Sequence, residues 1–315
     1  MNILIMGAGA LGSIFGGFLS RKNSVCLVGR KAHMKAIEAK GLRISGIWGE
    51  HFFKKLLSTT TIKGIKEKQD IIFVTTKSYD TRLAIENVKH LLKDDGYLVT
   101  MQNGIGNEDT ASEIIGKNRT IGGMAIFGAN LMESGHVKVT VYASECLVGE
   151  IDNNTRKSKE IAALINTAGI PTLPSDNIIR DKWMKAFYNI ALNPLSAILR
   201  MPYGFLGENK ETKNIMYLLL AEAFRVARAE RIALKVDLDS YFNFFLNRQV
   251  PSTASHRSSM LRDIEKGKKT EIDYLNGLIV EKGKVHGIPT PYNAVITQII
   301  KSLEKIPQVK NRAIV

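Results

Sequence analysis

Along the first half of the chain, apolar residues follow two patterns in turn: short continuous runs, and spacings of three or four residues. Short apolar runs at residues 2–6, 24–28, 70–77 and 97–101 have the length and composition of buried strands. Between and after these runs, helical spacing of apolar residues predicts a helix over residues 11–19, a second that ends near residue 40, and further helices near residues 80–93 and 155–168. Strands that alternate with helices in this way favour an α/β fold with a parallel sheet.

The first strand leads directly into a glycine-rich loop, Gly7-Ala8-Gly9-Ala10-Leu11-Gly12. In a dinucleotide-binding fold, the first glycine permits a tight turn, the second lets the backbone approach a pyrophosphate, and the third lets helix and strand pack closely. The start of the following helix offers free N–H groups to phosphates. A G-x-G-x-x-G pattern is common by itself, but between a strand and an amphipathic helix it predicts a nucleotide cofactor.

The residues after the second strand indicate which nucleotide is bound. A fold that binds NAD usually carries Asp or Glu here to bond the ribose 2′-hydroxyl, whereas this chain has Gly29-Arg30-Lys31. Two cations suit the 2′-phosphate of NADP, to which arginine makes paired, charge-assisted hydrogen bonds. NADP is therefore favoured. The alternative is a solvated basic loop.

Two polar residues follow later strands of the same series. Lys77 comes at the end of the strand at 70–77, and Asn103 comes soon after the strand at 97–101. Because ligands of open α/β sheets lie outside the carboxyl ends of the strands, we expect both side chains near the cofactor. Asn103-Gly104 is also an ordinary turn sequence, so this pattern alone leaves its role open.

The pattern changes after residues 169–175, which include two prolines. This change predicts a boundary between a domain of residues 1–174 and a domain of residues 175–315. The helical patterns that follow lie at 177–200, 210–232, 236–248, 255–266, 271–286 and 292–304. The expected fold class is an α/β Rossmann-type N-terminal domain with an all-α C-terminal domain.

One helix of the second domain carries an aligned polar stripe. From residue 186 it is apolar nearly all round, as in a buried helix, but Lys185, Asn189 and Asn193 interrupt it at spacings of four. Buried polar groups need partners, and a substrate would supply them. In the alternative interpretation, Lys185 extends to water and Asn193-Pro194 simply ends or kinks the helix.

A second polar segment runs from Ser258 to Tyr274. Gly267 is expected to end one helix, and Thr270 to cap the next with Asp273 as its capping-box partner. Glu271 would then lie in the first helical turn, where a carboxylate complements the helix dipole. Helix rules alone therefore favour a structural role for Glu271.

Composition limits the classes of partner. The formal charge is +14 and the isoelectric point is about 9.6, but the basic residues are scattered and no nucleic-acid-binding motif is present. The positive electrostatic potential of such a basic surface would help to attract small anionic ligands. No apolar run is long enough to span a bilayer, and the start of the chain does not resemble a signal peptide, so we expect a cytoplasmic protein. His256 and His286 lack partners at metal-ligand spacing, so no metal site is predicted.

Two motifs together resemble the ketopantoate reductase (2-dehydropantoate 2-reductase) family. They are K-x-x-x-N-x-x-x-N-P-L from Lys185 and S-S-M-x-x-D-I-x-x-G-x-x-T-E-I-D from Ser258, and the resemblance extends over nearly the whole chain. It implies a Rossmann domain followed by a helical domain. It also implies the reduction of 2-dehydropantoate to (R)-pantoate with NADPH, a step towards pantothenate and coenzyme A.

The resemblance also assigns roles to individual residues. Lys185 matches the family's general acid, and Glu271 matches a carboxylate near the substrate hydroxyl, which replaces the structural interpretation. The matching substrate contacts are Asn103, Asn189, Asn193 and Ser259, with Ser259 at the substrate carboxylate. The matching cofactor contacts are Gly7–Gly12, Arg30, Lys77 and Asn103, with Arg30 and Lys77 at the 2′-phosphate.

The segment after Pro194 departs from the family pattern. Many relatives have a P-N-G-E-L-like sequence whose asparagine lines the site, whereas this chain has the bulkier Tyr203 and Phe205. A reductase of a related 2-keto acid therefore remains an alternative. A non-catalytic NADP sensor is a second alternative, although it would need neither Lys185 nor Glu271. A homodimer is compatible with the sequence, which does not define the oligomeric state.

Overall fold

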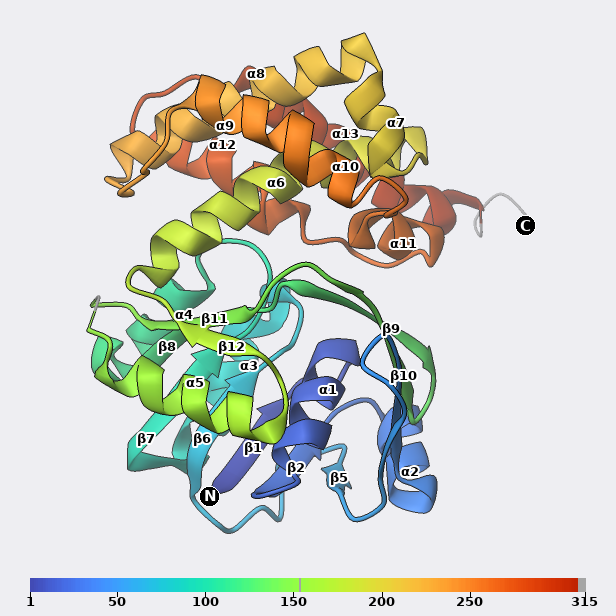
Figure 1. Ribbon diagram of the computed structural model, residues 1–315, viewed down its shortest axis with the longest axis vertical. Coiled ribbons are helices and arrows are strands. Elements are labelled where there is room, and N and C mark those ends of the chain that lie inside the picture. The colour runs from blue at the N-terminus through green and yellow to red at the C-terminus, as the bar shows by residue number, and fades with distance from the viewer. Residues whose placement is uncertain (153, 311–315) are drawn as a thin grey trace. The chain divides into compact units, whose positions relative to one another are not determined.

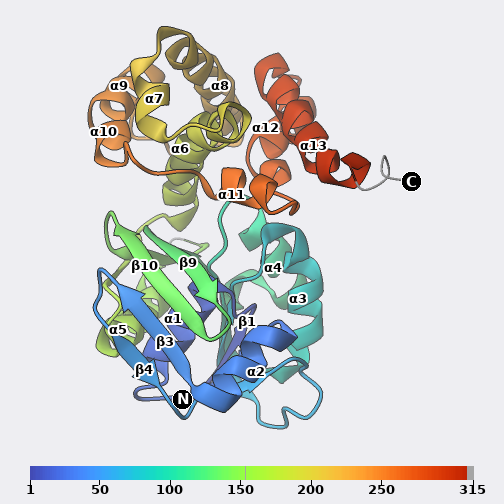
Figure 2. The ribbon, with the colours of Figure 1, turned by 90° about the vertical axis from the view of Figure 1, so that its right-hand side faces the viewer.

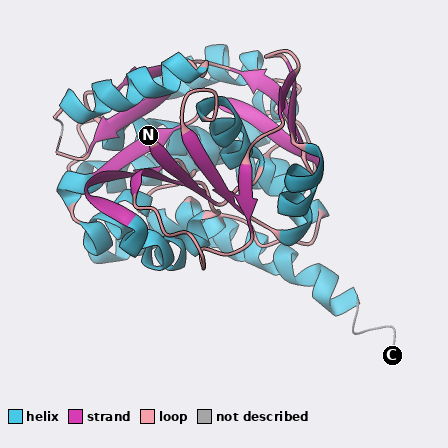
Figure 3. Ribbon diagram, turned by 90° about the horizontal axis from the view of Figure 1, so that it is seen from below, coloured by secondary structure: helices cyan, strands magenta, loops and turns pink. Residues whose placement is uncertain are grey.

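The computed structural model describes residues 1–152 and 154–310 and consists of two compact units, Met1–Ile179 and Arg180–Val315 (Figure 1). All strands of the described residues lie in the first unit, and the second unit is helical. Figure 3 distinguishes helices from strands by colour. The predicted fold class, an α/β domain followed by an all-α domain, is therefore confirmed. The two units divide between residues 179 and 180, inside the first turns of helix α6 (Ile178–Leu199).

The main sheet of the first unit has eight strands in the order β12-β11-β8-β7-β6-β1-β2-β5. All neighbouring pairs are parallel except β8 and β11. From β1 the chain moves to β2 on one side and later to β6 on the other, so β1 and β6 form the switch point of the sheet. The strands are β1 Asn2–Met6, β2 Ser24–Val28, β5 Leu57–Thr59, β6 Gln69–Val74, β7 Leu92–Thr100, β8 Thr120–Met124, β11 Cys146–Glu150 and β12 Thr172–Pro174.

Helices cover both faces of this sheet, because its central strands are buried on both sides. Ile3 and Ile5 of β1 belong to one core with α1 (Ala10–Leu19) and α5 (Arg156–Ala168). Leu4, which points the other way, belongs to a second core with α3 (Thr81–Val88) and α4 (Asn107–Ile115). Apolar residues on both faces explain why these strands are continuous hydrophobic runs. The remaining helices of the unit are α2 Lys31–Lys40 and the 3₁₀ turns η1 Ser78–Asp80, η2 Lys89–Leu91 and η3 Lys117–Arg119.

A smaller sheet of four strands in the order β4-β3-β10-β9 packs against the same side as α1 (Figure 2). The strands are β3 Leu42–Gly46, β4 His51–Phe53, β9 Phe127–Glu133 and β10 His136–Tyr142. β3 and β4 form an antiparallel hairpin. The parallel pairing of β3 with β10 was not predicted, because it joins segments that are far apart in the chain.

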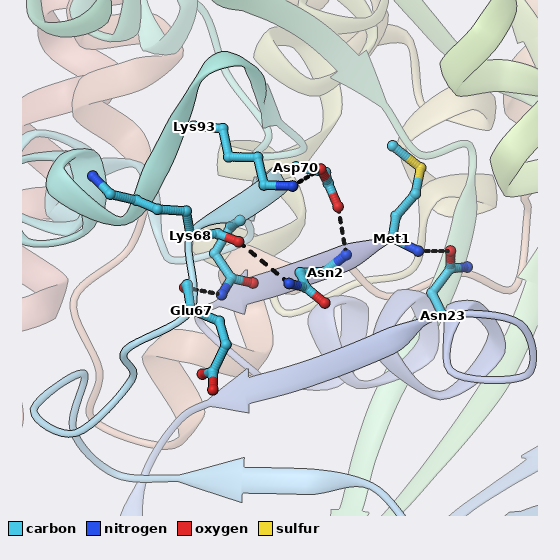
Figure 4. A network of polar contacts seen from close by, with 8 residues as sticks. Met1, Asn2, Asn23, Glu67, Lys68, Asp70 and Lys93 are labelled. Atoms are coloured by element: carbon cyan, nitrogen blue, oxygen red, sulfur yellow. Dashed lines mark hydrogen bonds and ion pairs between the residues drawn. The ribbon is translucent and has the colours of Figure 1, made fainter.

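A cluster of polar contacts fixes the beginning of β1 (Figure 4). The Asn2 backbone N–H donates to Asp70 Oδ2 at 2.6 Å, and Lys93 Nζ donates to Asp70 Oδ1 at 2.6 Å. The hydrogen bond from Lys93 holds the pKa of Asp70 below its ordinary value. The amino group of Met1 donates a hydrogen bond to Asn23 Oδ1 at 3.3 Å. Charge-assisted hydrogen bonds thus hold the amino end of β1, at the opposite end of the strand from the glycine loop.

The second unit is built around α6, which carries Trp183 and Phe187 into an aromatic core with Phe224, Tyr241 and Phe245. The Phe187 and Phe224 rings stack at 4.3 Å between centroids. Within the described residues, no helix has both the length and the apolar character needed to cross a membrane. The other elements are α7 Tyr203–Glu208, α8 Lys210–Ala229, α9 Leu238–Phe244, the π-helical turn η4 Phe245–Gln249, α10 Val250–Ser252, α11 Ser259–Glu265, η5 Ile272–Tyr274, α12 Asn276–Val285 and α13 Pro291–Lys310.

Pro194 does not end α6, which continues to Leu199. A proline within a helix removes the N–H that would bond the carbonyl four residues earlier, here that of Ile190. The side chain of Asn276 replaces this donor, with Nδ2 3.2 Å from Ile190 O. The helix therefore continues because a residue from α12 satisfies the carbonyl that the proline leaves free. The short helix α7, which follows, was not predicted.

The predicted helix at 271–286 is wrong at its beginning. Residues Ile272–Tyr274 form a 3₁₀ turn, and α12 starts only at Asn276. Thr270 Oγ1 accepts from Ile272 N–H at 3.2 Å and donates to Glu304 at 2.6 Å. Asp273 forms an ion pair with Lys301 at 2.6 Å. The predicted capping box is absent because both of its side chains bond to α13.

Candidate active site

The glycine loop lies at the switch point of the main sheet. Gly7 has a φ of +105°, and a Cβ built there would lie 2.5 Å from Thr76 N, at the carboxyl end of β6. The loop is closed by the N–H groups of Gly7 and Ala8, which donate to Val28 O at 3.0 and 2.8 Å. Only glycine combines this backbone conformation with this close approach of two strands. Gly7 is therefore required by the fold itself.

Gly12 and Gly9 differ in what surrounds them. A Cβ at Gly12 would lie 2.4 Å from Thr75 Oγ1 and 2.7 Å from Gly7 O, so this glycine allows α1 to pack on the loop. A Cβ at Gly9 would meet only Gly7 O, at 3.9 Å, and the residue has an extended backbone with a φ of −89°. The protein's own packing therefore leaves room for a side chain at Gly9 and does not explain why this residue is glycine.

The beginning of α1 is suited to an anion. Gly9 is the N-cap of this helix and provides no side-chain cap, and the first turn contains no acidic residue. The first N–H groups of an α-helix have no partner within the helix, and the helix dipole favours negative charge near them. A dinucleotide pyrophosphate would supply acceptors for these groups. The residues present thus fit a dinucleotide.

The other predicted cofactor residues follow the carboxyl ends of neighbouring strands. Arg30 is exposed and is the N-cap residue of α2, directly after β2. Lys77 is half-buried at the start of η1, after β6. Asn103 is exposed after β7, and its carbonyl accepts from Ser78 Oγ at 2.7 Å and from Asn107 Nδ2 at 3.0 Å. The structure therefore brings the predicted cofactor residues of the first unit to the carboxyl ends of neighbouring strands of the sheet.

Thr75 also lies at these strand ends, and the sequence analysis did not single it out. Its Oγ1 donates to Gly7 O at 2.8 Å and is also 3.3 Å from Met6 O. Its backbone N–H bonds Met6 O at 2.9 Å. Thr75 therefore joins the end of β6 to the glycine loop. Its position directly after the buried run 70–74 was the available signal.

In the second unit, the predicted polar stripe lies along one face of α6. Lys185 and Asn189 are half-buried, and Asn193 is 6% exposed. Most of the helix between Ala186 and Ala197 is buried, as its apolar sequence predicts. Lys182, which precedes Lys185 by one turn, is also buried and was not predicted. Lys185 and Asn189 are thus the partly exposed members of the stripe, and Asn193 extends it into the buried part of the helix.

Two other segments are joined directly to α6. Ser258 Oγ donates to Asn193 O at 3.2 Å and accepts from Leu261 N–H at 3.0 Å, so it fixes the start of α11, where Ser259 is half-buried. Glu271 is buried and is the N-cap residue of η5, five residues before Asn276, which bonds Ile190. The predicted residues of the second unit therefore lie on α6 or on segments bonded to it. Ser258 was not predicted as a positioning residue.

The two residues that depart from the family pattern have different surroundings. Phe205 is 40% exposed on α7. Tyr203 is buried, and its hydroxyl donates to Asn193 Oδ1 at 2.6 Å. Burial raises the pKa of Tyr203 and that of its neighbour Tyr188, the latter to about 12. The pKa of the nearby His256 is lowered, mainly by burial and also by the charge of Arg262. The groups beside Asn193 therefore favour their uncharged forms.

A mostly parallel sheet with a glycine loop at its switch point, followed by a helical unit with a polar stripe, is the architecture of a dinucleotide-binding α/β protein with an added helical domain. Residues 3–153 match the family described as ketopantoate reductase PanE/ApbA, and residues 177–304 match ketopantoate reductase PanE/ApbA C terminal. The chain belongs to this ketopantoate reductase family.

Individual relatives are similar over the whole chain. The 2-dehydropantoate 2-reductase of Aquifex aeolicus is 36% identical over 309 residues, which cover 96% of this chain and 97% of that protein. The crystal structure of a PanE/ApbA family ketopantoate reductase from Ralstonia eutropha JMP134 is 31% identical, with a TM-score of 0.88 and coverage of 98% and 100%. A ternary structure of D-mandelate dehydrogenase with NADH and anilino(oxo)acetate is 28% identical, with a TM-score of 0.87 and coverage of 97% and 98%.

Proposed function

We propose that this protein reduces 2-dehydropantoate to (R)-pantoate with NADPH, in the pathway to pantothenate and coenzyme A. The observation that carries the proposal is the stripe of Lys185, Asn189 and Asn193 on α6, in a chain similar to 2-dehydropantoate 2-reductases over nearly its full length. A nucleotide sensor would not require a proton donor and two amides along one helix face. The proposal therefore assigns cofactor binding to residues 1–174 and substrate binding and catalysis to residues 175–315.

In this proposal, NADPH is bound by the glycine loop and the cations at the strand ends. Gly7–Gly12 and the start of α1 would hold the pyrophosphate, Arg30 and Lys77 would bond the 2′-phosphate, and Asn103 would contact both cofactor and substrate. The open space beside Gly9 supports the first assignment. The absence of a carboxylate in Gly29-Arg30-Lys31 supports NADPH over NADH, because an acid there would repel a 2′-phosphate.

When bound, NADPH would supply the hydride that reduces the keto carbon of the substrate. As negative charge develops on the keto oxygen, Lys185 donates a proton to that atom, a contribution of about 10²–10⁴-fold for a well-placed general acid. Asn189 and Asn193 bond the substrate, Ser259 meets its carboxylate, and Glu271 orients its hydroxyl. The partial burial of Lys185 and the burial of Glu271 support these roles, because charges in such surroundings interact more strongly than in water.

A second candidate is the NADPH-dependent reduction of another 2-keto acid. Two observations favour it: Tyr203 and Phe205 replace the usual family residues, and a structural neighbour is named a D-mandelate dehydrogenase. In both candidate functions the substrate is a 2-keto acid, and its keto carbon accepts the hydride. They differ in the group attached to that carbon.

Steady-state oxidation of NADPH with a panel of 2-keto acids tests the proposal. The panel contains 2-dehydropantoate, phenylglyoxylate (the keto acid related to mandelate) and pyruvate. We expect the highest kcat/KM with 2-dehydropantoate and (R)-pantoate as the product. A higher kcat/KM for phenylglyoxylate would select the second candidate, and no turnover of any member would contradict both.

We further infer that the enzyme is cytoplasmic and acts on a small anionic 2-keto acid without a nucleic-acid partner. The scattered basic residues support attraction of anions without a nucleic-acid-binding surface. A homodimer is supported by apolar residues exposed along α13, namely Tyr292, Val295 and Ile299. Sedimentation equilibrium tests this assembly, and a single species of monomer mass at high concentration would exclude it.

A further inference from the structure

Tyr203 is held by the helical unit itself. The residue is 2% exposed, and its ring packs against those of Tyr188 and His256, with centroid distances of 5.7 and 5.1 Å. Its backbone N–H donates to His256 O at 3.0 Å. The position of the hydroxyl is thus fixed by the surrounding core, 2.6 Å from Asn193 Oδ1.

The direction of this hydrogen bond determines the orientation of the Asn193 amide. In the described part of the chain, Asn193 Oδ1 is the acceptor for the Tyr203 hydroxyl. If the hydroxyl accepted from the amide NH₂ instead, its own O–H would be buried without a partner, which is unfavourable. Burial also raises the pKa of the phenol, so it remains protonated and continues to donate. The amide oxygen therefore faces Tyr203, and the NH₂ group faces away from it.

The rest of Asn193 is fixed as well. Its carbonyl oxygen accepts from Ser258 Oγ at 3.2 Å, so both the main chain and the side chain are held. Among the described residues, none accepts a hydrogen bond from Asn193 Nδ2, and that atom is not sealed from solvent. Asn193 therefore retains two N–H donors that no described residue accepts from, while its side-chain oxygen is bonded to the Tyr203 hydroxyl.

We propose that Tyr203 is a positioning residue, which holds the Asn193 amide as a donor toward the substrate and so selects for a group that accepts hydrogen bonds. This inference rests on the proposed function, in which Asn193 contacts the substrate. The matching substrate groups are a carboxylate, a keto oxygen or a hydroxyl that acts as acceptor. Without the Tyr203 hydroxyl, the amide is free to turn and present its oxygen, which repels a carboxylate.

The test compares Tyr203→Phe with Tyr188→Phe, which removes a neighbouring hydroxyl that bonds Thr253 Oγ1 at 2.6 Å. We expect Tyr203→Phe to raise the KM for 2-dehydropantoate by about threefold to tenfold, the effect of one hydrogen bond. The kcat should change little, since the amide binds ground state and transition state alike, and the Kd for NADPH should be unchanged. Tyr188→Phe should resemble the wild type.

A double-mutant cycle separates positioning from a general structural effect. In an Asn193→Ala background, we expect Tyr203→Phe to cause no further rise in KM, because the amide it orients is gone. Additive effects, or an unchanged KM for Tyr203→Phe, would overturn the inference while the proposed function stands. No turnover of any 2-keto acid by the wild type would overturn the proposed function and, with it, the inference.

A second variant gives an independent test if Tyr203→Phe folds poorly. Asn193→Asp keeps an acceptor for the Tyr203 hydroxyl but removes the two donors. We expect Asn193→Asp to lose less thermal stability than Asn193→Ala. We also expect it to raise the KM for 2-dehydropantoate at least as much as Asn193→Ala does. A KM for Asn193→Asp equal to that of the wild type would contradict the donor role.

Discussion

Replacement of Gly9 by alanine should separate cofactor binding from folding. The added methyl would lie in open space, with Gly7 O at 3.9 Å as its nearest neighbour, and alanine tolerates the extended backbone of this residue. We therefore expect the free energy of unfolding of Gly9→Ala to stay within about 1 kcal/mol of the wild type. The same methyl would occupy the space in which a pyrophosphate approaches the start of α1.

The expected loss of affinity follows from the contacts that the methyl would block. Two hydrogen bonds to a charged phosphate contribute about 1.5–3 kcal/mol each. Loss of both weakens binding by at least about 3 kcal/mol, which corresponds to a rise of roughly 100-fold in the Kd for NADPH. Gly12→Ala is the matched control, because its methyl would lie 2.4 Å from Thr75 Oγ1 and 2.7 Å from Gly7 O. Such overpacking should cost about 1–3 kcal/mol of folding stability.

Calorimetric titration with NADPH and denaturant unfolding of the cofactor-free proteins provide the two measurements. Gly9→Ala should have near-normal stability with weak NADPH binding, and Gly12→Ala should show a clear loss of stability. Two results would contradict this role of Gly9. One is wild-type NADPH affinity in Gly9→Ala, and the other is a loss of stability in Gly9→Ala as large as that in Gly12→Ala.

Two further predictions concern single charged residues. For Arg30→Ala, we expect the Kd for NADPH to rise about tenfold to 100-fold with little change for NADH, because only NADPH carries the 2′-phosphate; equal losses for both would exclude this contact. For Asp70→Asn, we expect a loss of stability at neutral pH, whereas the exposed Asp94→Asn should have little effect. The pKa of Asp70 is lowered from 3.8, so its contribution is complete above that pH and is lost as the pH falls through the folded-state pKa. Urea unfolding should show that the free energies of unfolding of the wild type and of Asp70→Asn converge as the pH falls through this range. A difference that stays constant with pH would contradict a stabilising role of the ionised Asp70.

The parts of the fold that the sequence predicts well are those governed by local pattern. The run at residues 2–6, the glycine loop and α1 form one continuous unit, and their periodicity is enough to identify them. The stripe on α6 was also visible, since Lys185, Asn189 and Asn193 interrupt an apolar helix at regular spacing. Such features depend on neighbours within a few residues.

The parts that were missed depend on residues distant in sequence. Pro194 suggested an end or a kink in the helix, but Asn276 donates to the carbonyl of Ile190 and the helix continues. Thr270 suggested a helix cap, but it bonds Glu304. The position of Tyr203 against Asn193 likewise follows from tertiary packing. No local rule contains these partners, so the sequence alone could not reveal them.

In the proposed function, the first unit binds the cofactor and Lys185 of the second unit donates the proton. Single-turnover reduction of 2-dehydropantoate by Lys185→Ala, with the Kd for NADPH measured on the same preparation, tests it directly. We predict an unchanged Kd for NADPH and a rate of NADPH oxidation lower by about 10²–10⁴-fold. A rate equal to that of the wild type would contradict the account.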